Sequence, residues 1–437
     1  MNNENTLHIF SNGIRLGSLK KNKQGTLALN YDNTWLESRD AYPVSLSLPL
    51  TTKQLSGEKV YNYFDNLLPD NPVIRHTIQT KFQLRSNHPF DLLACIGKDC
   101  VGSIQLLHDN EIPNDNSMRF TPVTEKEIAG ILRSHKKNPL GMSDSFSAFR
   151  LSIAGAQEKT AFLQHNNTWC VPESSTPTSH IFKLPIGHLS NQNIDLSQSC
   201  ENEWLCSEIV RAFGLAVADT KIKVFDGVKT LVVKRFDRAY NDSKNSLLRL
   251  PQEDMCQALG LSPHLKYEAD GGPGIQQIMA ALLGSEQAAL DREHFFRSQI
   301  IFWLLCAIDG HAKNISIFLK PGGLYQLTPF YDILSAYPII ANKELHERKA
   351  QMAMALRGKN VYYKWYEAKR SHFLETAKKA NITEKQATSL LDDTLTCVDS
   401  VIDHVATLIP SDFPEEIASS IFKGMLRMRD RLVKHST

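Results

Sequence analysis

The chain has 437 residues, of which 42% are hydrophobic and 22% are charged, close to an average soluble globular protein. This composition excludes a disordered chain, a collagen-like chain and a small disulfide-stapled domain. The 49 Lys and Arg residues against 47 Asp and Glu leave a formal charge of +2, which argues against coating nucleic acid by bulk charge but allows a local basic patch. At roughly 150 residues per domain, the length predicts two or three domains.

The eight cysteines are scattered, with no Cys-x-x-Cys pair and no zinc-finger spacing, so we expect reduced thiols in the core. The N-terminus has no basic region followed by a long apolar stretch, so no secretory signal is expected. The longest apolar run, Ile300–Ile308, is far shorter than the roughly 20 residues that span a bilayer. We therefore expect a soluble, cytoplasmic protein with no membrane partner.

The first part of the chain mixes predicted strands and helices. Asn12-Gly13 predicts a hairpin turn. Asn71-Pro72 predicts a capped helix start, with the helix running to about Leu84. The expected strands are Leu7–Phe10, Ile14–Leu19, Gly25–Tyr31, Val44–Leu48 and Val101–Leu107, and a second helix is expected over Phe90–Ile96.

The polar stretch from His108 to Val123 is expected to be a linker. Thr124 and Glu127 have the spacing of a capping box and predict a helix after them. The expected strands that follow are Phe149–Ile153, Thr160–Leu163, Trp169–Val171, Ile181–Leu184, Ile222–Val224 and Thr230–Val233, interrupted by a helix over Gln198–Phe213. After Asp237 the chain is expected to be mostly helical, apart from a hairpin-like stretch over Ile315–Thr328. This outline predicts a two-lobed α+β fold.

A loop of small residues separates two of the expected strands. Gly155, between Ala154 and Ala156, lets the backbone approach an anion, and successive N–H groups can form a nest for phosphate oxygens. The loop matches neither of the standard phosphate-binding fingerprints. A tight turn and a phosphate-binding loop are both open interpretations.

The segment from Asp309 to Asn314 has the Asp-x-x-x-x-Asn spacing of kinase catalytic loops. In such loops the Asp orients or deprotonates the attacking hydroxyl, and the Asn holds a magnesium ion. Asp332, in a turn eighteen residues after Asn314, can provide a second magnesium ligand. The alternatives are an ordinary Asp-Gly turn at a helix end and an ordinary Pro-containing turn.

The order of these features favours phosphoryl transfer. A glycine loop, a lysine on a later strand (Lys183), the Asp-x-x-x-x-Asn segment and a downstream Asp follow one another as a phosphotransferase needs them. Lys183 alternates with apolar neighbours on its expected strand, so its ammonium can reach phosphates. The pattern predicts an ATP-dependent phosphotransferase.

The chain resembles the HipA family of bacterial serine/threonine-kinase toxins along essentially its whole length. The matching segments are Phe64–Asp70, Ile153–Thr160, Leu250–Gln257, Asp270–Gly274, Asp309–Asn314 and Leu327–Asp332. The resemblance implies a two-lobed protein-kinase-like fold of the phosphatidylinositol-kinase-like type, with an extra N-terminal subdomain and a mainly helical C-terminal lobe. The expected domains are 1–123, the small lobe 124–236 and the helical lobe 237–437.

The resemblance also implies the site residues. Asp309 matches the catalytic Asp, and Asn314 and Asp332 match the magnesium ligands. Ser152 matches the serine that autophosphorylates and inactivates the enzyme. The positions that match ATP-binding residues are Ala154, Gly155, Ala156, Gln157, Glu158, Lys159, Lys183, Arg235, Phe236, His311, Asn314 and Asp332. ATP and Mg²⁺ are the expected cofactors, and Arg235-Phe236 is the expected adenine hinge.

The implied biology is that of a type II toxin–antitoxin pair. The expected partner is HipB, a helix-turn-helix antitoxin that holds the toxin on operator DNA, so that the complex is nucleoid-associated and the chain acts as co-repressor. The expected substrate is glutamyl-tRNA synthetase, whose phosphorylation arrests translation and promotes persistence and multidrug tolerance. Lys234, where the family pattern has a glutamate, and the short segment Ala341–Lys349 depart from that pattern.

Two other functions are open on the residues alone. One is a nucleotide-binding co-repressor subunit with weak catalysis. The other is a small-molecule kinase of the choline or aminoglycoside type, which shares the Asp-x-x-x-x-Asn logic but lacks the extra N-terminal subdomain. No helix-turn-helix is evident in the sequence, so DNA reading is expected to come from a partner.

Overall fold

The structure is a computed structural model that describes residues 5–109, 111, 113, 118–134, 157, 159–189, 193–241 and 246–434. The chain divides into two compact units. Unit 1 comprises Met1–Leu184, Lys223–Pro263 and Ile317–Tyr325. Unit 2 comprises Pro185–Ile222, His264–Ser316 and Gln326–Thr437. The predicted division into 1–123, 124–236 and 237–437 stays a prediction.

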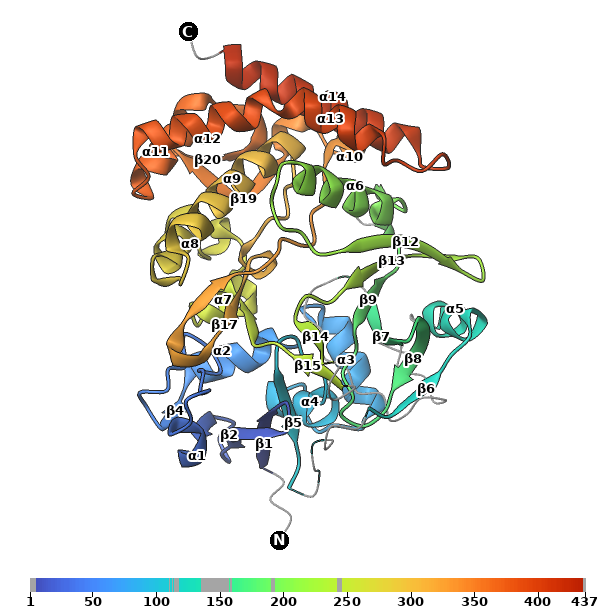
Figure 1. The fold of residues 1–437 in the computed structure, drawn as a ribbon, viewed down its shortest axis with the longest axis vertical. Helices are drawn as coiled ribbons and strands as arrows, with labels where there is room; N and C mark the ends of the chain where they lie inside the picture. The colour runs from blue at the N-terminus through green and yellow to red at the C-terminus, as the bar shows by residue number, and fades with distance from the viewer. Residues whose placement is uncertain are drawn as a thin grey trace. The chain divides into compact units, whose positions relative to one another are not determined.

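Unit 1 begins with a five-stranded antiparallel sheet in the order β4-β3-β2-β1-β5 (Figure 1). Its strands are β1 (Thr6–Ser11), β2 (Ile14–Lys21), β3 (Leu27–Tyr31), β4 (Gln54–Ser56) and β5 (Ile104–Leu107). The predicted hairpin is confirmed: Asn12 and Gly13 have φ values of 47° and 84°, as a two-residue turn between twisted strands requires. The expected strand over Val101–Leu107 is confirmed in its second half.

Four helices pack with this sheet: α1 (Asn33–Leu36), α2 (Glu58–Asn66), α3 (Pro72–Lys81) and α4 (Pro89–Ile96). The predicted cap of α3 is confirmed, because the Asn71 side chain accepts a hydrogen bond of 2.9 Å from the Val73 N–H. The helix ends at Lys81, before the expected Leu84, because Gln83 takes a left-handed conformation with φ 52°. Side chains of these helices and strands, among them Leu7, Ile9 and Phe64, form one buried core.

The expected strand over Val44–Leu48 is wrong. These residues form a turn closed by a single bridge between Ser45 and Leu48. The Ser45 hydroxyl donates to the Gln257 carbonyl, and the Leu46 N–H donates to the Glu253 carboxyl. Contacts with residues some two hundred positions away therefore replace the strand ladder that the alternating Ser and Leu pattern suggested.

A second sheet of six strands has the order β12-β13-β9-β7-β8-β6. Its strands are β6 (Phe120–Pro122), β7 (Lys159–His165), β8 (Thr168–Pro172), β9 (His180–Lys183), β12 (Thr220–Phe225) and β13 (Val228–Lys234). Helix α5 (Glu125–Arg133) starts with the predicted capping box of Thr124 and Glu127. The linker prediction is wrong for Phe120–Pro122, which pair with β8. The expected strand Phe149–Ile153 lies outside the described residues.

Shorter strands complete unit 1: β14 (Arg238–Asn241) pairs with β15 (Ser246–Arg249), and β16 (Gln252–Asp254) pairs with β17 (Ser316–Leu319), which pairs with β18 (Tyr325–Leu327). Helix α7 (Met255–Ala258) follows β16. The hairpin expected over Ile315–Thr328 is confirmed. The expectation of a mostly helical chain directly after Asp237 is wrong, because β14 to β16 come first.

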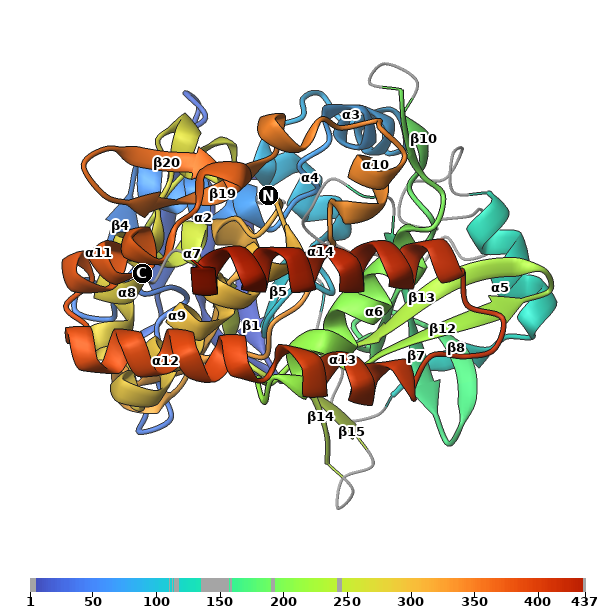
Figure 2. The ribbon, with the colours of Figure 1, turned by 90° about the horizontal axis from the view of Figure 1, so that it is seen from above.

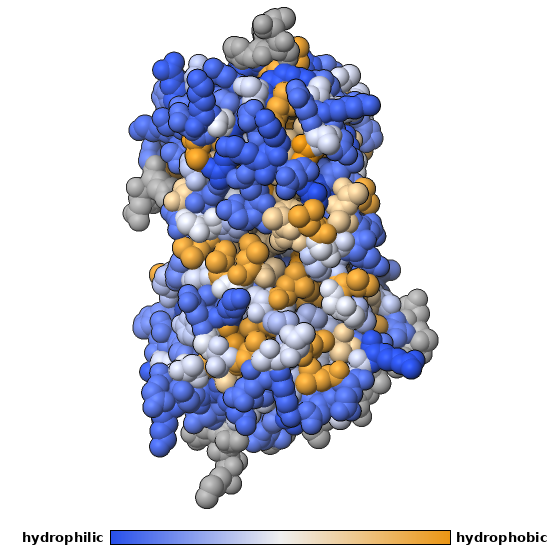
Figure 3. All heavy atoms as spheres, turned by 90° about the vertical axis from the view of Figure 1, so that its left-hand side faces the viewer, coloured by the Kyte–Doolittle hydropathy of each residue, from blue (hydrophilic) through white to orange (hydrophobic). Residues whose placement is uncertain are grey.

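Unit 2 is mainly helical. Its helices are α6 (Ser199–Ala212), α8 (Ile275–Ala281), α9 (Ala288–Leu305), α10 (Tyr337–Ala341), α11 (Arg370–Lys379), α12 (Glu384–Thr396), α13 (Val398–Ala406) and α14 (Glu415–Lys434). Two hairpins accompany them, β10 (Gly187–Leu189) with β11 (Ile194–Leu196) and β19 (Gln351–Arg357) with β20 (Val361–Lys364). Figure 2 shows α14 lying alongside α13. The surface over α11 and α12 is mainly hydrophilic (Figure 3).

The cysteines behave as predicted, since all eight are free and six of them are buried. Burial raises the pKa of the Cys206 and Cys306 thiols far above the usual range. These thiols therefore pack as small apolar groups. No helix in the described part of the chain is long and apolar enough to cross a membrane.

Candidate active site

The predicted catalytic loop leaves the end of the buried helix α9 in unit 2. Cys306 has a left-handed conformation with φ 50°, and the Ala307 N–H donates back to the Phe302 carbonyl at 2.8 Å, which is how helices commonly end. The helix therefore stops at Leu305, before the Ile308 at which the apolar run ends. The chain turns outward here and brings Asp309 to the surface with half of its side chain exposed.

Hydrogen bonds within the loop hold Asn314 against Asp309. The Asn314 side-chain N–H donates to the Asp309 carbonyl at 2.8 Å, and the Asp309 carbonyl also accepts the His311 N–H at 2.8 Å. Because the amide nitrogen of Asn314 is used, its amide oxygen is the atom left for a cation. Gly310 is required by close packing, since a Cβ there would lie 2.8 Å from the Phe302 ring.

The Asp309 carboxyl is oriented and still accessible. The Tyr267 hydroxyl donates to Asp309 Oδ1, and His311 Nε2 lies 3.9 Å from the same oxygen. A half-exposed carboxylate held in this way can accept a proton from a substrate hydroxyl. Asp309 therefore has the geometry of a general base.

His311 is buried beside this carboxyl. Its ring packs edge-on against Tyr267, with the ring centroids 5.0 Å apart. Burial lowers the pKa of His311, and the charge of Asp309 only partly opposes this, so the imidazole is neutral at neutral pH. Its buried Nδ1 has no hydrogen-bond partner among the described residues. A buried ring nitrogen without a protein partner fits contact with a bound ligand.

Asp332 is held in an uncommon backbone conformation, with φ 59°. The residues before it are fixed: the Phe330 N–H donates to the Ala216 carbonyl at 2.8 Å, and the Tyr331 hydroxyl donates to the Lys313 carbonyl at 2.8 Å. A left-handed residue other than glycine costs about 1 kcal/mol and persists only where its surroundings impose it. These contacts impose it and present the Asp332 carboxyl from a fixed turn.

The structure brings three of the predicted residues into one pocket of unit 2. Asp309, Asn314 and Asp332 line one shallow pocket, together with Gly310 and Tyr331 among others. Carboxylate and amide oxygens are the ligands that Mg²⁺ prefers, usually one or two from the protein, with water and substrate phosphates completing the shell. The described residues contain no group of three or more His, Cys, Asp and Glu that could hold a metal. Asn314 and Asp332 supply oxygen atoms of the kind that Mg²⁺ takes as ligands.

The predicted phosphate lysine, Lys183, lies in unit 1 on β9. It is buried, and the ladder register places it opposite Lys159 on β7, which is buried as well. The Gln157 side chain donates to the Leu184 carbonyl at 2.7 Å, next to this pair. The register therefore brings the two lysine side chains onto neighbouring strands of one ladder. Ser152, Ala154, Gly155, Ala156 and Glu158 lie outside the described residues.

The predicted adenine hinge, Arg235-Phe236, is partly buried in unit 1. The Arg235 N–H donates to the Ser179 carbonyl at 2.9 Å, and its guanidinium is buried in ion pairs with Asp99 and Asp237. Phe236 packs edge-on against Phe318, with centroids 5.8 Å apart. The side chain of Arg235 is therefore structural, and an adenine contact through main-chain groups stays a prediction. Lys234 is exposed.

Tyr267 is the residue of the candidate site that sequence reasoning missed. It precedes Asp309 by forty-two positions, and no spacing rule connects a tyrosine to a catalytic loop so far along the chain. The nearest signal in the sequence was the Asp270–Gly274 segment, whose glycine-rich turn keeps Tyr267 in place through the hydrogen bond from the Gly272 N–H to its carbonyl.

Comparison with known proteins defines the class first. A protein named "Putative kinase Y4mE" from Sinorhizobium fredii is 30% identical over 92% of this chain and 93% of its own length. The serine/threonine-protein kinase toxin HipA of Shewanella oneidensis is 27% identical over 80% of this chain and 78% of its own length. The predicted enzyme class, a serine/threonine protein kinase, is confirmed.

The family follows from the domain matches. Residues 7–107 match the HipA N-terminal domain and residues 151–402 match the HipA-like C-terminal domain. The chain therefore belongs to the HipA family. Its fold also matches a chain in the structure of the Shewanella oneidensis toxin–antitoxin system HipA, HipB and operator DNA complex, with a TM-score of 0.81 at 21% identity over 98% of this chain and 97% of that chain. The predicted α+β kinase-like fold class is confirmed.

Proposed function

We propose that the chain is an ATP- and Mg²⁺-dependent serine/threonine protein kinase and the toxin of a toxin–antitoxin pair. The observation that carries this proposal is the pocket that holds Asp309, Asn314 and Asp332 together. A small-molecule kinase is disfavoured, because the N-terminal HipA domain matches residues 7–107.

The proposed reaction transfers the γ-phosphoryl group of ATP to a serine or threonine hydroxyl. Asp309 accepts the hydroxyl proton as the oxygen attacks phosphorus, and ADP leaves. Tyr267 orients the carboxyl, and Lys183, with Lys159 opposite it, attracts the ATP phosphates. Asn314 and Asp332 would hold Mg²⁺, which supplies charge neutralisation of the phosphoryl oxygens. Gln157, Arg235, Phe236 and His311 complete the proposed ATP contacts.

The finer assignments rest on the resemblance. We propose Ser152 as the autophosphorylation site, because a dianion next to a loop that binds phosphates would repel ATP and switch the enzyme off. Glutamyl-tRNA synthetase is the proposed substrate, with translation arrest and persistence as the outcome. A HipB-type antitoxin is the proposed partner, carrying the chain to operator DNA at the nucleoid as a co-repressor. The match to the complex of HipA, HipB and operator DNA supports this partner.

The test is to incubate the unphosphorylated full chain with Mg²⁺ and γ-labelled ATP, alone and with glutamyl-tRNA synthetase, and to map the label by mass spectrometry. We expect label on Ser152 in the chain alone and on the synthetase when it is added. Both labels should be absent with Asp309→Ala and present with Asp403→Ala, an exposed aspartate on α13. Protein that binds ATP but acquires and transfers no label would instead support a catalytically weak co-repressor.

A further inference from the structure

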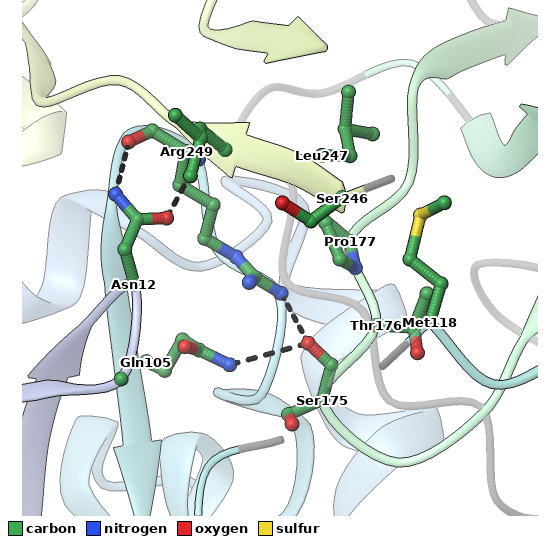
Figure 4. Close-up of a pocket in the computed structure, with 11 residues that line it drawn as sticks. Asn12, Gln105, Met118, Ser175, Thr176, Pro177, Ser246, Leu247 and Arg249 are labelled. Carbon is green, nitrogen blue, oxygen red and sulfur yellow. Dashed lines mark hydrogen bonds between the residues drawn. The ribbon is translucent and has the colours of Figure 1, made fainter. Parts of the chain in front are cut away.

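A second pocket, within unit 1, has none of the residues proposed for phosphoryl transfer in its lining. It is lined by Asn12, Gln105, Met118, Ser175, Ser246 and Arg249 among others. These residues come from the β1–β2 turn, β5, the segment just before β6, the loop before β9, and β15 (Figure 4). The pocket therefore combines polar groups with apolar surface, as small-molecule sites do.

A buried cluster of charges with one positive charge in excess lies behind this pocket. Asp99 contacts Arg235, Arg238 and Arg249 at 3.4, 2.9 and 3.2 Å, and Asp237 contacts Arg235 and Arg238 at 2.7 and 3.0 Å. Three arginines thus face two aspartates, all of them nearly inaccessible to solvent. A buried charge is costly unless it is paired, so a bound anion would complete the cluster.

The charges in this cluster persist at neutral pH. Burial alone would raise the pKa of Asp99, but the three guanidinium groups hold it well below its usual range. Burial lowers the pKa of Arg249 to about 10, although Asp99 opposes this, and the guanidinium is still protonated at pH 7. Among the described residues of this cluster, one positive charge is therefore left unbalanced at neutral pH.

Two hydrogen-bond donors lining the pocket lack a protein acceptor. Arg249 donates from Nε to Asp99 at 3.3 Å and from Nη2 to the Ser175 carbonyl at 2.7 Å, and its Nη1 makes no hydrogen bond to a described residue. Ser246 is only 8% exposed, yet its hydroxyl has no partner in the described part of the chain. Because the Ser246 hydroxyl is buried without a partner, it costs free energy that a ligand acceptor would recover, and Arg249 Nη1 offers a second donor to the same ligand.

The pocket is held in place before any ligand arrives. The Asn12 side chain donates to the Arg249 carbonyl at 2.8 Å and accepts the Arg249 N–H at 2.9 Å, which fixes the β15 backbone. Gln105 donates to the same Ser175 carbonyl that Arg249 uses, at 3.3 Å. In the view of Figure 4, Ser246 lies between Arg249 and the apolar side chain of Met118. Binding would therefore need little ordering of the protein.

We propose that this pocket binds a small monocarboxylate with a short apolar chain. The carboxylate would accept hydrogen bonds from Arg249 Nη1 and the Ser246 hydroxyl, and the chain would pack on Met118 and Leu247. The single excess charge matches one carboxylate better than a phosphate dianion, and guanidinium groups suit planar carboxylates. This inference does not depend on the proposed kinase reaction.

The test is isothermal titration calorimetry of the full chain with butanoate, with butanamide as the uncharged probe and inorganic phosphate as the dianion. We expect butanoate to bind at one site and to bind at least ten-fold more tightly than the other two. Equal binding of butanamide, tighter binding of phosphate, or no binding of butanoate at millimolar concentrations would each overturn the proposal.

Variants locate the binding. Ser246→Ala should weaken butanoate binding about five-fold, the effect of one hydrogen bond, while Ser400→Ala on α13 should leave it unchanged. Arg249→Gln would test the main contact, but it also breaks a buried ion pair and can unfold the chain. Met118→Glu is the safer second test, since it adds a carboxylate at the partly exposed wall and should weaken binding at least ten-fold. Unchanged affinity in both Ser246→Ala and Met118→Glu would refute this location.

Discussion

The two charged regions of this chain use similar side chains in opposite ways. In unit 1, Asp99 is buried and surrounded by three arginines, so that its charge is fully used in holding segments together. In unit 2, Asp309 is half exposed and oriented by one tyrosine hydroxyl. A carboxylate whose hydrogen bonds are all internal stabilises a fold, whereas one that is oriented but accessible can react.

The two regions also differ in backbone conformation and in buried polar atoms that lack a hydrogen-bond partner among the described residues. The catalytic loop region contains a left-handed Asp332 and a buried His311 nitrogen without a partner among the described residues. Strain and unsatisfied groups of this kind gather where a ligand completes the structure. Substitutions that remove one charge from each region test this difference.

The largest effect should come from Asp332→Asn. The substitution removes a carboxylate proposed to hold Mg²⁺ and tolerates the left-handed backbone, so activity should fall about 10³-fold with stability unchanged. Activity is measured as phosphoryl transfer from γ-labelled ATP, and stability is measured by urea unfolding. Asp403→Asn on α13 is the matched control. An Asp332→Asn protein with full activity would remove Asp332 from the proposed metal site.

Asp99→Asn should show the reverse pattern. It leaves three buried guanidinium groups with one aspartate, so the free energy of unfolding should fall by about 3 kcal/mol, while the folded fraction keeps its activity. Urea unfolding followed by circular dichroism measures the loss. The control is Asp392→Asn, which breaks an exposed pair with Arg370 and should cost under about 1 kcal/mol. Equal losses in the two variants would show that burial of the Asp99 pairs is not what stabilises unit 1.

Glu253 in unit 1 is a buried carboxyl without an arginine partner among the described residues, and its substitution tests how such a group responds to pH. Burial raises its pKa from 4.5 to about 8, although the hydrogen bond from the Leu46 N–H opposes this. The folded state therefore binds the proton more tightly than the unfolded state, and stability should fall as pH rises from about 5 to about 8. Glu253→Gln should remove this pH dependence and be more stable than the wild type at the upper end of the window, by about 1.4 kcal/mol for each unit by which the pKa is raised.

The measurement for Glu253 is the urea midpoint at several pH values across that window. The wild type and Glu253→Gln should converge at the acid end and separate as pH rises. Parallel curves for the two proteins would show that Glu253 is ionised in the folded state throughout.

Tyr267→Phe should have the smallest effect. Loss of one hydrogen bond to Asp309 is worth about 1 kcal/mol, so kcat should fall about five-fold with KM for ATP unchanged. Steady-state kinetics separate the two constants. A change confined to KM would assign Tyr267 to substrate binding.

Local chemistry made much of the fold predictable. The Asn12-Gly13 turn, the Asn71 cap and the Thr124–Glu127 capping box each depend on residues within a few positions, and all three are confirmed. The wrong strand at Val44–Leu48 shows the limit, because its hydrogen bonds go to Glu253 and Gln257. Such distant partners cannot be identified from a local pattern.

The candidate site likewise contains residues that local sequence patterns identified and residues that depend on how distant segments pack. The spacing of Asp309 and Asn314 and the turn at Asp332 identified the residues that line the pocket in unit 2. The sequence could not indicate that Tyr267 orients Asp309 or that Lys159 lies opposite Lys183, because both depend on how separate segments pack or pair. It also placed Arg235 in an adenine hinge without showing that its side chain is buried in ion pairs.

The most direct test of this account is to measure phosphoryl transfer and unfolding free energy on one preparation of Asp309→Asn. We expect transfer to fall about 10²- to 10³-fold, because a positioned base contributes on that scale, and the unfolding free energy to stay within about 0.5 kcal/mol of the wild type. Retained transfer, or loss of transfer only through unfolding, would contradict the assignment of Asp309 as the reactive carboxylate.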